Sequence, residues 1–180
     1  MKIIAGKYKG QGIKTIDNTS TRPMMAQARE SIFNSLQLEI NNAKVLDLFS
    51  GSGSLGIESL SRGANFVTFV EISKKAVRIL KNNLIKIEEE TVVVGMDALK
   101  WINSSDDRFD IIFIDPPFEY KNELLCELLD KTVDNLEDSG KIILHRHSSS
   151  EALNIVRKLE LVKEKNFGQS VLRTYRKMFI

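Results

Sequence analysis

The chain of 180 residues is poor in several residue types, and each scarcity excludes a class of protein. One cysteine, Cys126, cannot form an internal disulfide, and two histidines are too few for a usual zinc site without further cysteines. Three prolines and no internal repeat are typical of one compact globular domain. No secretory leader opens the chain and no apolar run approaches the ~20 residues of a membrane span, so we expect a cytoplasmic protein with no membrane contact.

The chain also lacks an excess of one charge, because 26 basic and 24 acidic residues give a net charge of only +2. The basic and acidic side chains are unevenly distributed along the chain. Residues 1–30 carry six basic and two acidic side chains, and residues 155–180 carry seven and two, so the segment between them is acidic. Two basic ends around an acidic middle are consistent with RNA backbone contacts at the termini and a cationic cofactor in the core, although solvated surface is the simpler interpretation of either end.

What the chain does contain is a series of short, almost wholly apolar segments. They lie at residues 45–48, 67–70, 92–94 and 111–114, and they alternate with helical patterns. Strands that are apolar on both faces are typical of a parallel sheet covered by helices on both sides. A helix is expected near residues 24–38. Residues 161–167 and 171–179, joined by Gly168, predict antiparallel strands at the edge of the sheet.

A glycine-rich turn follows the first of these strands. Gly51, Gly53 and Gly56 spell G-x-G-x-x-G between a strand and a helical pattern, where backbone N–H groups can face a nucleotide. The next strand closes on Glu71, which is placed to bind ribose hydroxyls. This pattern alone fits either NAD or S-adenosylmethionine.

Two further acids favour S-adenosylmethionine. Asp47 precedes the glycines, where a carboxylate could meet the ammonium group of that cofactor but would repel a pyrophosphate. Asp97 follows the third strand, where it could accept a hydrogen bond from the adenine amine. Because the carboxyl ends of parallel strands meet at one edge of a sheet, these acids and Asp115 after the fourth strand are expected to converge.

The most informative segment is Asp115-Pro116-Pro117-Phe118, which begins where the fourth strand ends. Prolines cannot extend the ladder of a strand, so they stiffen its exit, fix the carboxylate and direct neighbouring carbonyls outward. The amine of a nucleobase can donate to a carboxylate and a carbonyl while its ring stacks on Phe118. The tetrapeptide predicts chemistry on the amino group of a base, and a plain turn is the weaker interpretation.

The order of these motifs resembles the family of 16S rRNA guanine-N2 methyltransferases named for guanine 966. The resemblance spans nearly the whole chain and includes residues 3–10, 22–23, 29–34, 47–64 and 167–175. The chain departs from the family pattern at Met24, where threonine is usual, and at His145-Arg146-His147, where an acid is common.

The resemblance implies an α/β, Rossmann-like class I methyltransferase with a mostly parallel seven-stranded sheet, helices on both faces and an antiparallel C-terminal strand. It divides one compact unit into an N-terminal basic hairpin and helix extension, residues 1–40, and an S-adenosylmethionine-binding domain, residues 41–180. It implies methylation of the N2 amine of a guanine, guanine 966, in a 16S rRNA hairpin loop during 30S assembly. The expected partner is 16S rRNA or a small-subunit assembly intermediate, with the protein acting as a monomer.

The same resemblance, with the motifs above, assigns roles to individual residues. The expected catalytic residues are Asp115, Pro116, Pro117 and Phe118. The expected S-adenosylmethionine contacts are Asp47, Gly51, Gly53, Leu55, Glu71, Ile72, Asp97 and Ala98. The expected RNA contacts are Lys7, Lys9, Arg22, Arg29 and Arg173. No metal is expected, because His145 and His147 point the same way on a strand without a third ligand.

Several residues have a simpler structural interpretation. Trp101 and Cys126 are expected to pack in the core. Cys126 lies beside an apolar stripe of a predicted helix that comprises Leu125, Leu128, Leu129, Val133 and Leu136. For Arg22 and Arg29, which are seven residues apart, phosphate contact and plain surface exposure stay equally open.

Three rival functions stay open. A DNA methyltransferase acting on adenine or cytosine amines shares the tetrapeptide but usually carries extra sequence for target recognition. A release-factor glutamine methyltransferase usually has Asn-Pro-Pro-Tyr in its place. A noncatalytic RNA-binding or ribosome-assembly module could keep the fold, although the intact acids at the strand ends argue against lost activity.

Overall fold

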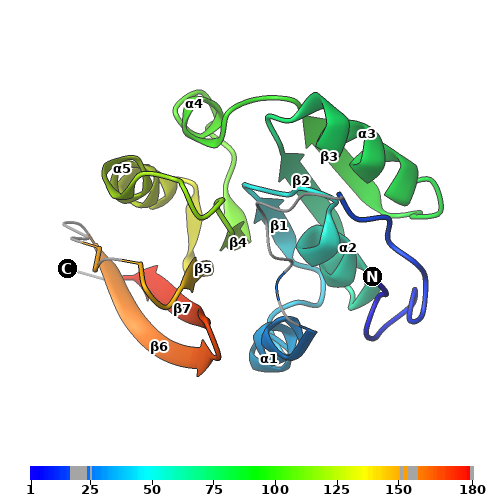
Figure 1. Ribbon diagram of the computed structural model, residues 1–180, viewed down its shortest axis with the longest axis horizontal. Helices are drawn as coiled ribbons and strands as arrows, with labels where there is room; N and C mark the ends of the chain where they lie inside the picture. Colours follow the sequence, from blue (N-terminus) through cyan, green and yellow to red (C-terminus); the bar gives the residue numbers. More distant parts are fainter. Residues whose placement is uncertain (17–23, 25, 151, 154–157, 179–180) are drawn as a thin grey trace.

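A seven-stranded sheet forms the centre of the computed structural model, which describes residues 1–16, 24, 26–150, 152–153 and 158–178 (Figure 1). The strand order is β3-β2-β1-β4-β5-β7-β6. The strands are β1 (Lys44–Asp47), β2 (Phe66–Val70), β3 (Glu90–Val94), β4 (Phe109–Ile114), β5 (Leu136–His147), β6 (Leu159–Phe167) and β7 (Ser170–Lys177). Neighbours from β3 to β5 are parallel, and β7 runs antiparallel to both β5 and β6. The predicted sheet with its antiparallel C-terminal strand is confirmed.

Helices cover both faces of this sheet, as Figure 1 shows for α1 and α2 on one side and α4 and α5 on the other. The first core contains side chains of α1 (Ala26–Ser35), α2 (Ser54–Ser61) and α3 (Lys74–Asn83). The second contains side chains of α4 (Ala98–Ile102) and α5 (Asn122–Thr132). Within the described residues, no helix combines the length and apolarity that crossing a membrane requires.

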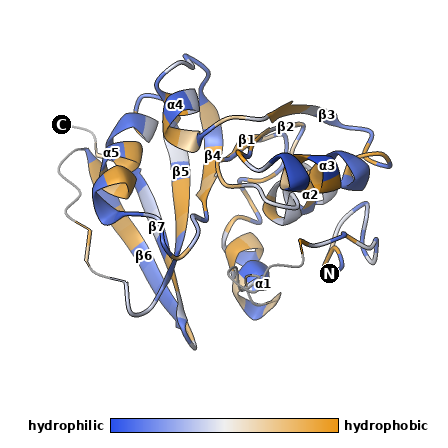
Figure 2. Cartoon of the chain, turned by 45° about the horizontal axis from the view of Figure 1, so that its top comes forward, coloured by the Kyte–Doolittle hydropathy of each residue, from blue (hydrophilic) through white to orange (hydrophobic). Residues whose placement is uncertain are grey.

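Alternation along the strands explains why they are apolar on both faces. Val45 and Ile111 pack in the first core, whereas Leu46 and Ile112, their immediate neighbours in sequence, pack in the second. Because successive strand side chains point to opposite faces, a strand between two helical layers needs an apolar residue at every position. In Figure 2 the central strands are accordingly coloured hydrophobic, and α3 and α5 show one hydrophilic and one hydrophobic side.

One boundary predicted from the helical stripe is wrong. Leu136 does not continue α5, which ends at Thr132; it begins β5 and pairs with Phe109. The side-chain amide of Asn135 donates to the carbonyls of Ser105 and Asp107, which fixes the turn between helix and strand. Leu136 is apolar because it is fully buried in the strand. Its match to the helical spacing of the preceding residues is a coincidence. The first helix, α1, is also shorter than the expected 24–38.

The N-terminal segment folds back on itself and is held against α2 and α3 by buried polar side chains. An isolated antiparallel bridge joins Lys2 and Gly12. The carboxylate of Glu58 on α2, which is 0% exposed, accepts the backbone N–H groups of Ile4 at 2.8 Å and Ala5 at 3.1 Å, and pairs with Arg62. Apolar side chains of this segment belong to the same core as the sheet. The division at residue 40 stays a prediction.

A second polar side chain ties this segment to the glycine-rich loop. The amide nitrogen of Asn83 donates to the carbonyls of Lys14 and Ser52, both at 2.9 Å, and its oxygen accepts the N–H of Lys14. Asn83 is itself buried. One side chain at the end of α3 therefore positions both the N-terminal segment and the loop after β1.

Replacing Glu58 with alanine should destabilise the protein by about 3 kcal/mol, because two backbone donors and Arg62 lose their buried acceptor. Glu58→Gln keeps an acceptor and should cost less. The free energy of unfolding in urea measures both, and Glu127→Ala, at an exposed position of α5, is the matched control. Equal stability of Glu58→Ala and the control would show that the hydrogen bonds of the Glu58 carboxylate contribute nothing to the free energy of unfolding.

Candidate active site

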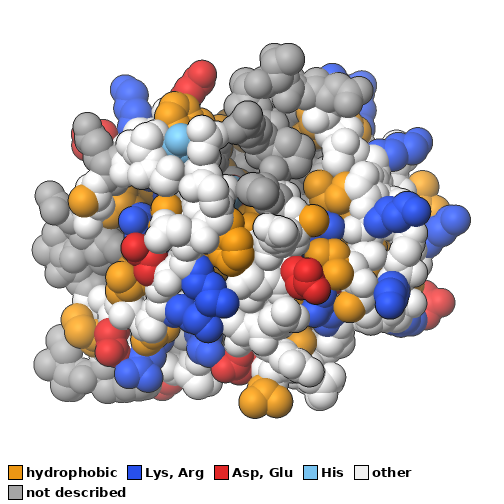
Figure 3. All heavy atoms as spheres, turned by 60° about the horizontal axis from the view of Figure 1, so that its bottom comes forward, with side chains coloured by type: hydrophobic (Ala, Val, Ile, Leu, Met, Phe, Trp, Pro, Cys, Tyr) orange, Lys and Arg blue, Asp and Glu red, His pale blue; other side chains and the backbone are white. Residues whose placement is uncertain are grey.

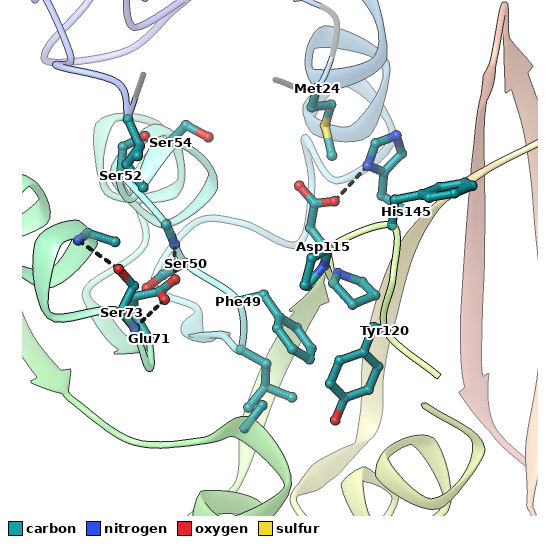
Figure 4. A pocket seen from close by; sticks show the side chains of 18 of the residues that line it. Met24, Phe49, Ser50, Ser52, Ser54, Glu71, Ser73, Asp115, Tyr120 and His145 are labelled. Carbon is teal, nitrogen blue, oxygen red and sulfur yellow. Dashed lines mark hydrogen bonds and ion pairs between the residues drawn. The ribbon is translucent and has the colours of Figure 1, made fainter. Parts of the chain in front are cut away.

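A cavity of about 910 Å³ opens at the carboxyl ends of the parallel strands (Figure 4). Its lining comes from the segments that follow β1, β2, β3 and β4 and from the last residues of β5. Thr15, Ile16 and Met24, from the chain before the sheet, also line it. The predicted site residues on this lining are Gly51, Glu71, Ile72, Asp97, Ala98, Asp115, Pro116, Pro117 and Phe118. Gly51 and Asp115, which belong to two motifs and are 64 residues apart in sequence, therefore line one cavity.

The glycine-rich loop is held in place by Glu71. Gly51 and Gly53 have positive φ angles of 51° and 86°, which side chains other than glycine rarely adopt. A Cβ on Gly53 would also meet the end of the Leu80 side chain, which would have to shift. The carboxylate of Glu71 accepts the N–H of Gly51 and the N–H of Ser73, each at 2.8 Å. Glu71 thus joins the loop after β1 to the segment after β2.

Asp47 lies behind this loop rather than on the cavity lining. It is 1% exposed, one carboxylate oxygen accepts the N–H of Gly56 at 3.2 Å, and the other has no partner among the described residues. Burial raises the pKa of Asp47 to about 8, and the negative charges of Asp115 and Glu71 act in the same direction. Gly53 and Leu55 are buried and do not line the cavity either. Direct contact of these three residues with a cofactor stays a prediction.

The segment after β3 forms the next part of the lining. Asp97 caps α4 by accepting the N–H of Lys100 at 3.0 Å, which orients its carboxylate. Tyr120, whose ring packs edge-on against Phe49 with centroids 5.1 Å apart, lies on the same lining. Burial raises the pKa of the Tyr120 hydroxyl, and the charge of Asp97 adds to this. Sequence reasoning gave neither aromatic residue a role, although Phe49 lies between Asp47 and the glycines and Tyr120 lies two residues after Phe118.

Asp115 and Phe118 occupy the opposite side of the cavity. A carboxylate oxygen of Asp115 lies 2.7 Å from Nδ1 of His145, and Figure 4 shows the two side chains pointing toward one another. Phe118 is 61% exposed, and its ring meets the ring of His147 edge-on, with centroids 5.2 Å apart. Pro116, which follows Asp115 in sequence, is buried. The sequence placed both histidines on one face of a strand but did not predict these contacts.

The predicted RNA contacts are dispersed, and several are already engaged. Lys9 is exposed, whereas Lys7 pairs with Glu88 and Glu89 and Arg173 pairs with Glu164. Hydrogen bonds to the two glutamates raise the pKa of Lys7. Figure 3 shows one face of the molecule, on which basic side chains are scattered among acidic and uncharged ones.

Arg29 and Arg22 differ from the other predicted RNA contacts. Arg29 is only 4% exposed, and its guanidinium donates to the carbonyl of Lys2 and contacts the sulfur of Met1. In this structure Arg29 therefore holds the first residues of the chain rather than facing outward. Arg22 lies outside the described residues.

Three further expectations concern the core and metals. Trp101 is 8% exposed and packs in the second core, as predicted, and Cys126 is half-buried on α5. Among the described residues, no group of three or more His, Cys, Asp and Glu side chains is arranged to hold a metal ion.

Comparison with known proteins identifies the chain's relatives. The model of the family described as "Conserved hypothetical protein 95" matches residues 1–176. A Haemophilus influenzae protein named "Ribosomal RNA small subunit methyltransferase D" is 32% identical, over 97% of this chain and 93% of its own length.

Solved structures show the same relationship. One from Escherichia coli, titled "Putative methyltransferase yhhF", is 31% identical and superposes with a TM-score of 0.86 over 98% of this chain and 97% of its own. A methyltransferase from Agrobacterium tumefaciens, titled as SAM-dependent, is 19% identical with a TM-score of 0.67, over 89% of this chain and 64% of its own, and shows that the fold is shared.

Replacing Asp47 with asparagine should make stability less dependent on pH. With a folded pKa of about 8, above the usual value of 3.8, Asp47 contributes stability that is present below about pH 4 and is lost as the pH rises through 8. Asparagine does not titrate, so the variant should gain roughly 4 kcal/mol relative to the wild type between pH 5 and pH 9, nearly all of it below pH 8. Urea unfolding at both pH values measures this, with exposed Asp134→Asn as the control. Parallel profiles of variant and wild type would contradict it.

Proposed function

Because the chain belongs to the family described as "Conserved hypothetical protein 95" and is similar over nearly its whole length to a ribosomal RNA small subunit methyltransferase, we propose that it transfers the methyl group of S-adenosylmethionine to 16S rRNA. The target that we propose is the exocyclic N2 amine of a guanine in a hairpin loop, guanine 966, in 16S rRNA or in a small-subunit assembly intermediate. Membership of a methyltransferase family was the expectation from the sequence motifs. The nucleotide and the amine are proposals.

The observation that carries this proposal is the position of Asp115 and Phe118. A carboxylate and an exposed aromatic ring lie on the same cavity as a glycine-rich loop. An acceptor beside a stacking surface suits a flat donor such as a base amine. The distance between the two motifs in sequence makes their meeting in one cavity more informative than either motif alone.

The cavity fits S-adenosylmethionine by charge and by shape. Glu71, Asp97 and Asp115 line it, and a negative potential in a partly enclosed cavity attracts a cationic ligand. Ile72 is 67% exposed on the same lining and offers an apolar surface for a flat ring. We assign to the cofactor site Asp47, Gly51, Gly53, Leu55, Glu71, Ile72, Asp97 and Ala98. When bound, S-adenosylmethionine supplies an electrophilic methyl group on a positively charged sulfur.

The protein's own contribution to catalysis is alignment and charge stabilisation. We assign the amine of the base to hydrogen bonds with the Asp115 carboxylate and the Pro116 carbonyl, with the base stacked on Phe118. Guanine N2 is a weak nucleophile because its lone pair is delocalised into the ring, so fixed alignment with the methyl group accounts for most of the expected acceleration. When the amine takes the methyl group, the Asp115 carboxylate would stabilise the positive charge that develops on nitrogen, and the nitrogen would then lose one proton to water.

Access to this cavity requires an unstacked base. A base in a duplex cannot present its amine to Asp115 while stacking on Phe118, so we propose an unpaired or extruded nucleotide as the target. Exposed Lys9, together with Lys7, Arg22 and Arg173, is proposed to contact the RNA backbone, with buried Arg29 acting through the N-terminal segment. We propose that residues 1–40 form the RNA-facing extension of the domain at 41–180, and that the protein acts as a monomer.

The expected product is N2-methylguanosine. Methyl transfer from labelled S-adenosylmethionine is to be measured on 30S particles and on naked 16S rRNA, both from cells that lack the enzyme, with nucleoside analysis by mass spectrometry. The better of the two substrates identifies the stage of assembly. Label in DNA or protein, or no label in RNA, would reject the proposed function.

Asp115→Ala should lower the rate of methyl transfer by about a hundredfold or more, because the acceptor that stabilises the amine's developing charge is lost. Cofactor affinity should be retained, since the cofactor contacts assigned above come mainly from other strands. Asp115→Asn preserves shape without charge and should be nearly as slow. Equilibrium binding of S-adenosylmethionine, measured beside the single-turnover rate, separates the two effects. Parallel loss of both would refute this division of roles.

A further inference from the structure

We propose that His145 is a positioning residue for Asp115: its imidazole holds one carboxylate oxygen and leaves the other for the amine of the substrate. This inference rests on the proposed function, because it concerns the same carboxylate. It gives a role to the His-x-His sequence at the end of β5, which belongs to no group of three or more potential metal ligands among the described residues.

The pairing of β4 with β5 places the two side chains together. Ile114 lies opposite Leu144 in this parallel pair, so the next residues of the two strands, Asp115 and His145, emerge side by side at the cavity. Nδ1 of His145 is 2.7 Å from Oδ1 of Asp115, a distance typical of a charge-assisted hydrogen bond. The histidine side chain is 13% exposed and the aspartate side chain 32%, so the contact is partly shielded from water and still borders the cavity.

The chemistry of the pair determines which ring nitrogen carries the proton. An ionised carboxylate can only accept hydrogen bonds, so Nδ1 must be the donor. The other ring nitrogen, Nε2, is buried and finds no partner among the described residues. A buried N–H group without an acceptor is rarer in native structures than a buried acceptor without a donor. A buried Nε2 without a partner is therefore more easily accommodated when it carries no proton. The arrangement fits the neutral tautomer with its proton on Nδ1.

The hydrogen bond from His145 restricts the rotation of the Asp115 carboxylate, which the two prolines cannot restrict. Pro116 and Pro117 stiffen the backbone after Asp115, but the carboxylate can still rotate about its terminal side-chain bond. The hydrogen bond from His145 engages Oδ1, which leaves Oδ2 as the oxygen that can meet the amine. A preset acceptor needs no reorganisation when the base arrives, and this lowers the barrier rather than strengthening the binding of substrate.

The neighbouring histidine supports the same interpretation of the strand end. His147, two residues further along β5, contacts the ring of Phe118. Because side chains two apart on a strand share a face, β5 supports both groups that the substrate is proposed to touch. His145 therefore belongs to a positioning surface formed by the end of β5.

The test compares three substitutions of His145 in the full chain. His145→Leu removes the donor, His145→Gln places an amide near the position of Nε2, and His145→Asn places one near the position of Nδ1. We expect kcat to fall about tenfold to a hundredfold in the first two variants, the usual effect of losing a hydrogen bond to a charged group. His145→Asn should recover most of the wild-type kcat. The KM for RNA, the affinity for S-adenosylmethionine and the thermal stability should change little in all three.

A purely structural role would give a different pattern. Losses in kcat that are equal in all three variants, or that follow losses in stability and cofactor affinity, would overturn the proposal. So would a wild-type kcat in His145→Leu.

A second measurement does not require turnover. The chain has only two histidines, so nitrogen NMR of the labelled protein gives two imidazole rings, which His147→Asn assigns. A proton on Nδ1 of His145 that is lost in Asp115→Ala is expected, and a proton confined to Nε2 would overturn the pairing. The activity measurements distinguish two kinds of failure. If the wild type methylates RNA and His145→Leu methylates it equally fast, only the positioning role of His145 fails. If the wild type methylates no RNA, the proposed function fails, and the positioning role fails with it.

Discussion

The convergence of four acidic side chains at one edge of the sheet is the constraint on which the rest of the site depends. Parallel pairing brings the ends of adjacent strands together, so Asp47, Glu71, Asp97 and Asp115 cannot avoid one another. Each is held by at least one hydrogen-bond donor: backbone N–H groups for the first three and His145 for the last. At Asp47, burial is the main cause of the raised pKa, and the charges of Asp115 and Glu71 add to it. An acidic edge of this kind is stable enough to fold and still favours a cation.

The two sides of the cavity are organised differently. On the side of the glycine-rich loop, backbone donors fix the acids, and the positive φ angles of Gly51 and Gly53 fix the loop. On the side of Asp115, the side chain of His145 from the neighbouring strand β5 fixes the carboxylate. A backbone N–H donor is kept when most side chains change, whereas a side-chain donor can be replaced by few residue types. The second side is therefore the one where small sequence changes can alter the acceptor without disturbing the fold.

Sequence patterns predicted the four central parallel strands, the two C-terminal strands and the convergence of the acids that follow the central ones. Apolar runs identified the strands because helices cover both faces, and the strand ends then met as the topology requires. Patterns could not reveal that Arg29 is buried, because a lone arginine on a helix gives no sign of a carbonyl 27 residues earlier that accepts its hydrogen bond. They could not pair Asp115 with His145 either, since that contact depends on the register between β4 and β5. Leu136 shows a different limit, because one buried leucine satisfies a helical and a strand pattern equally well.

The links from the N-terminal segment to Glu58 and Asn83 have a consequence for the order in which this chain can fold. Ile4 and Ala5 find their acceptor more than 50 residues later, and Lys14 finds its partner 69 residues later. During synthesis the first residues therefore emerge long before the groups that satisfy them, and non-local contacts of this length form slowly. The backbone groups of the first residues therefore stay in contact with water or a chaperone until α3 has left the ribosome. Only then can the loop that faces the cavity take its final position, since Asn83 joins the two.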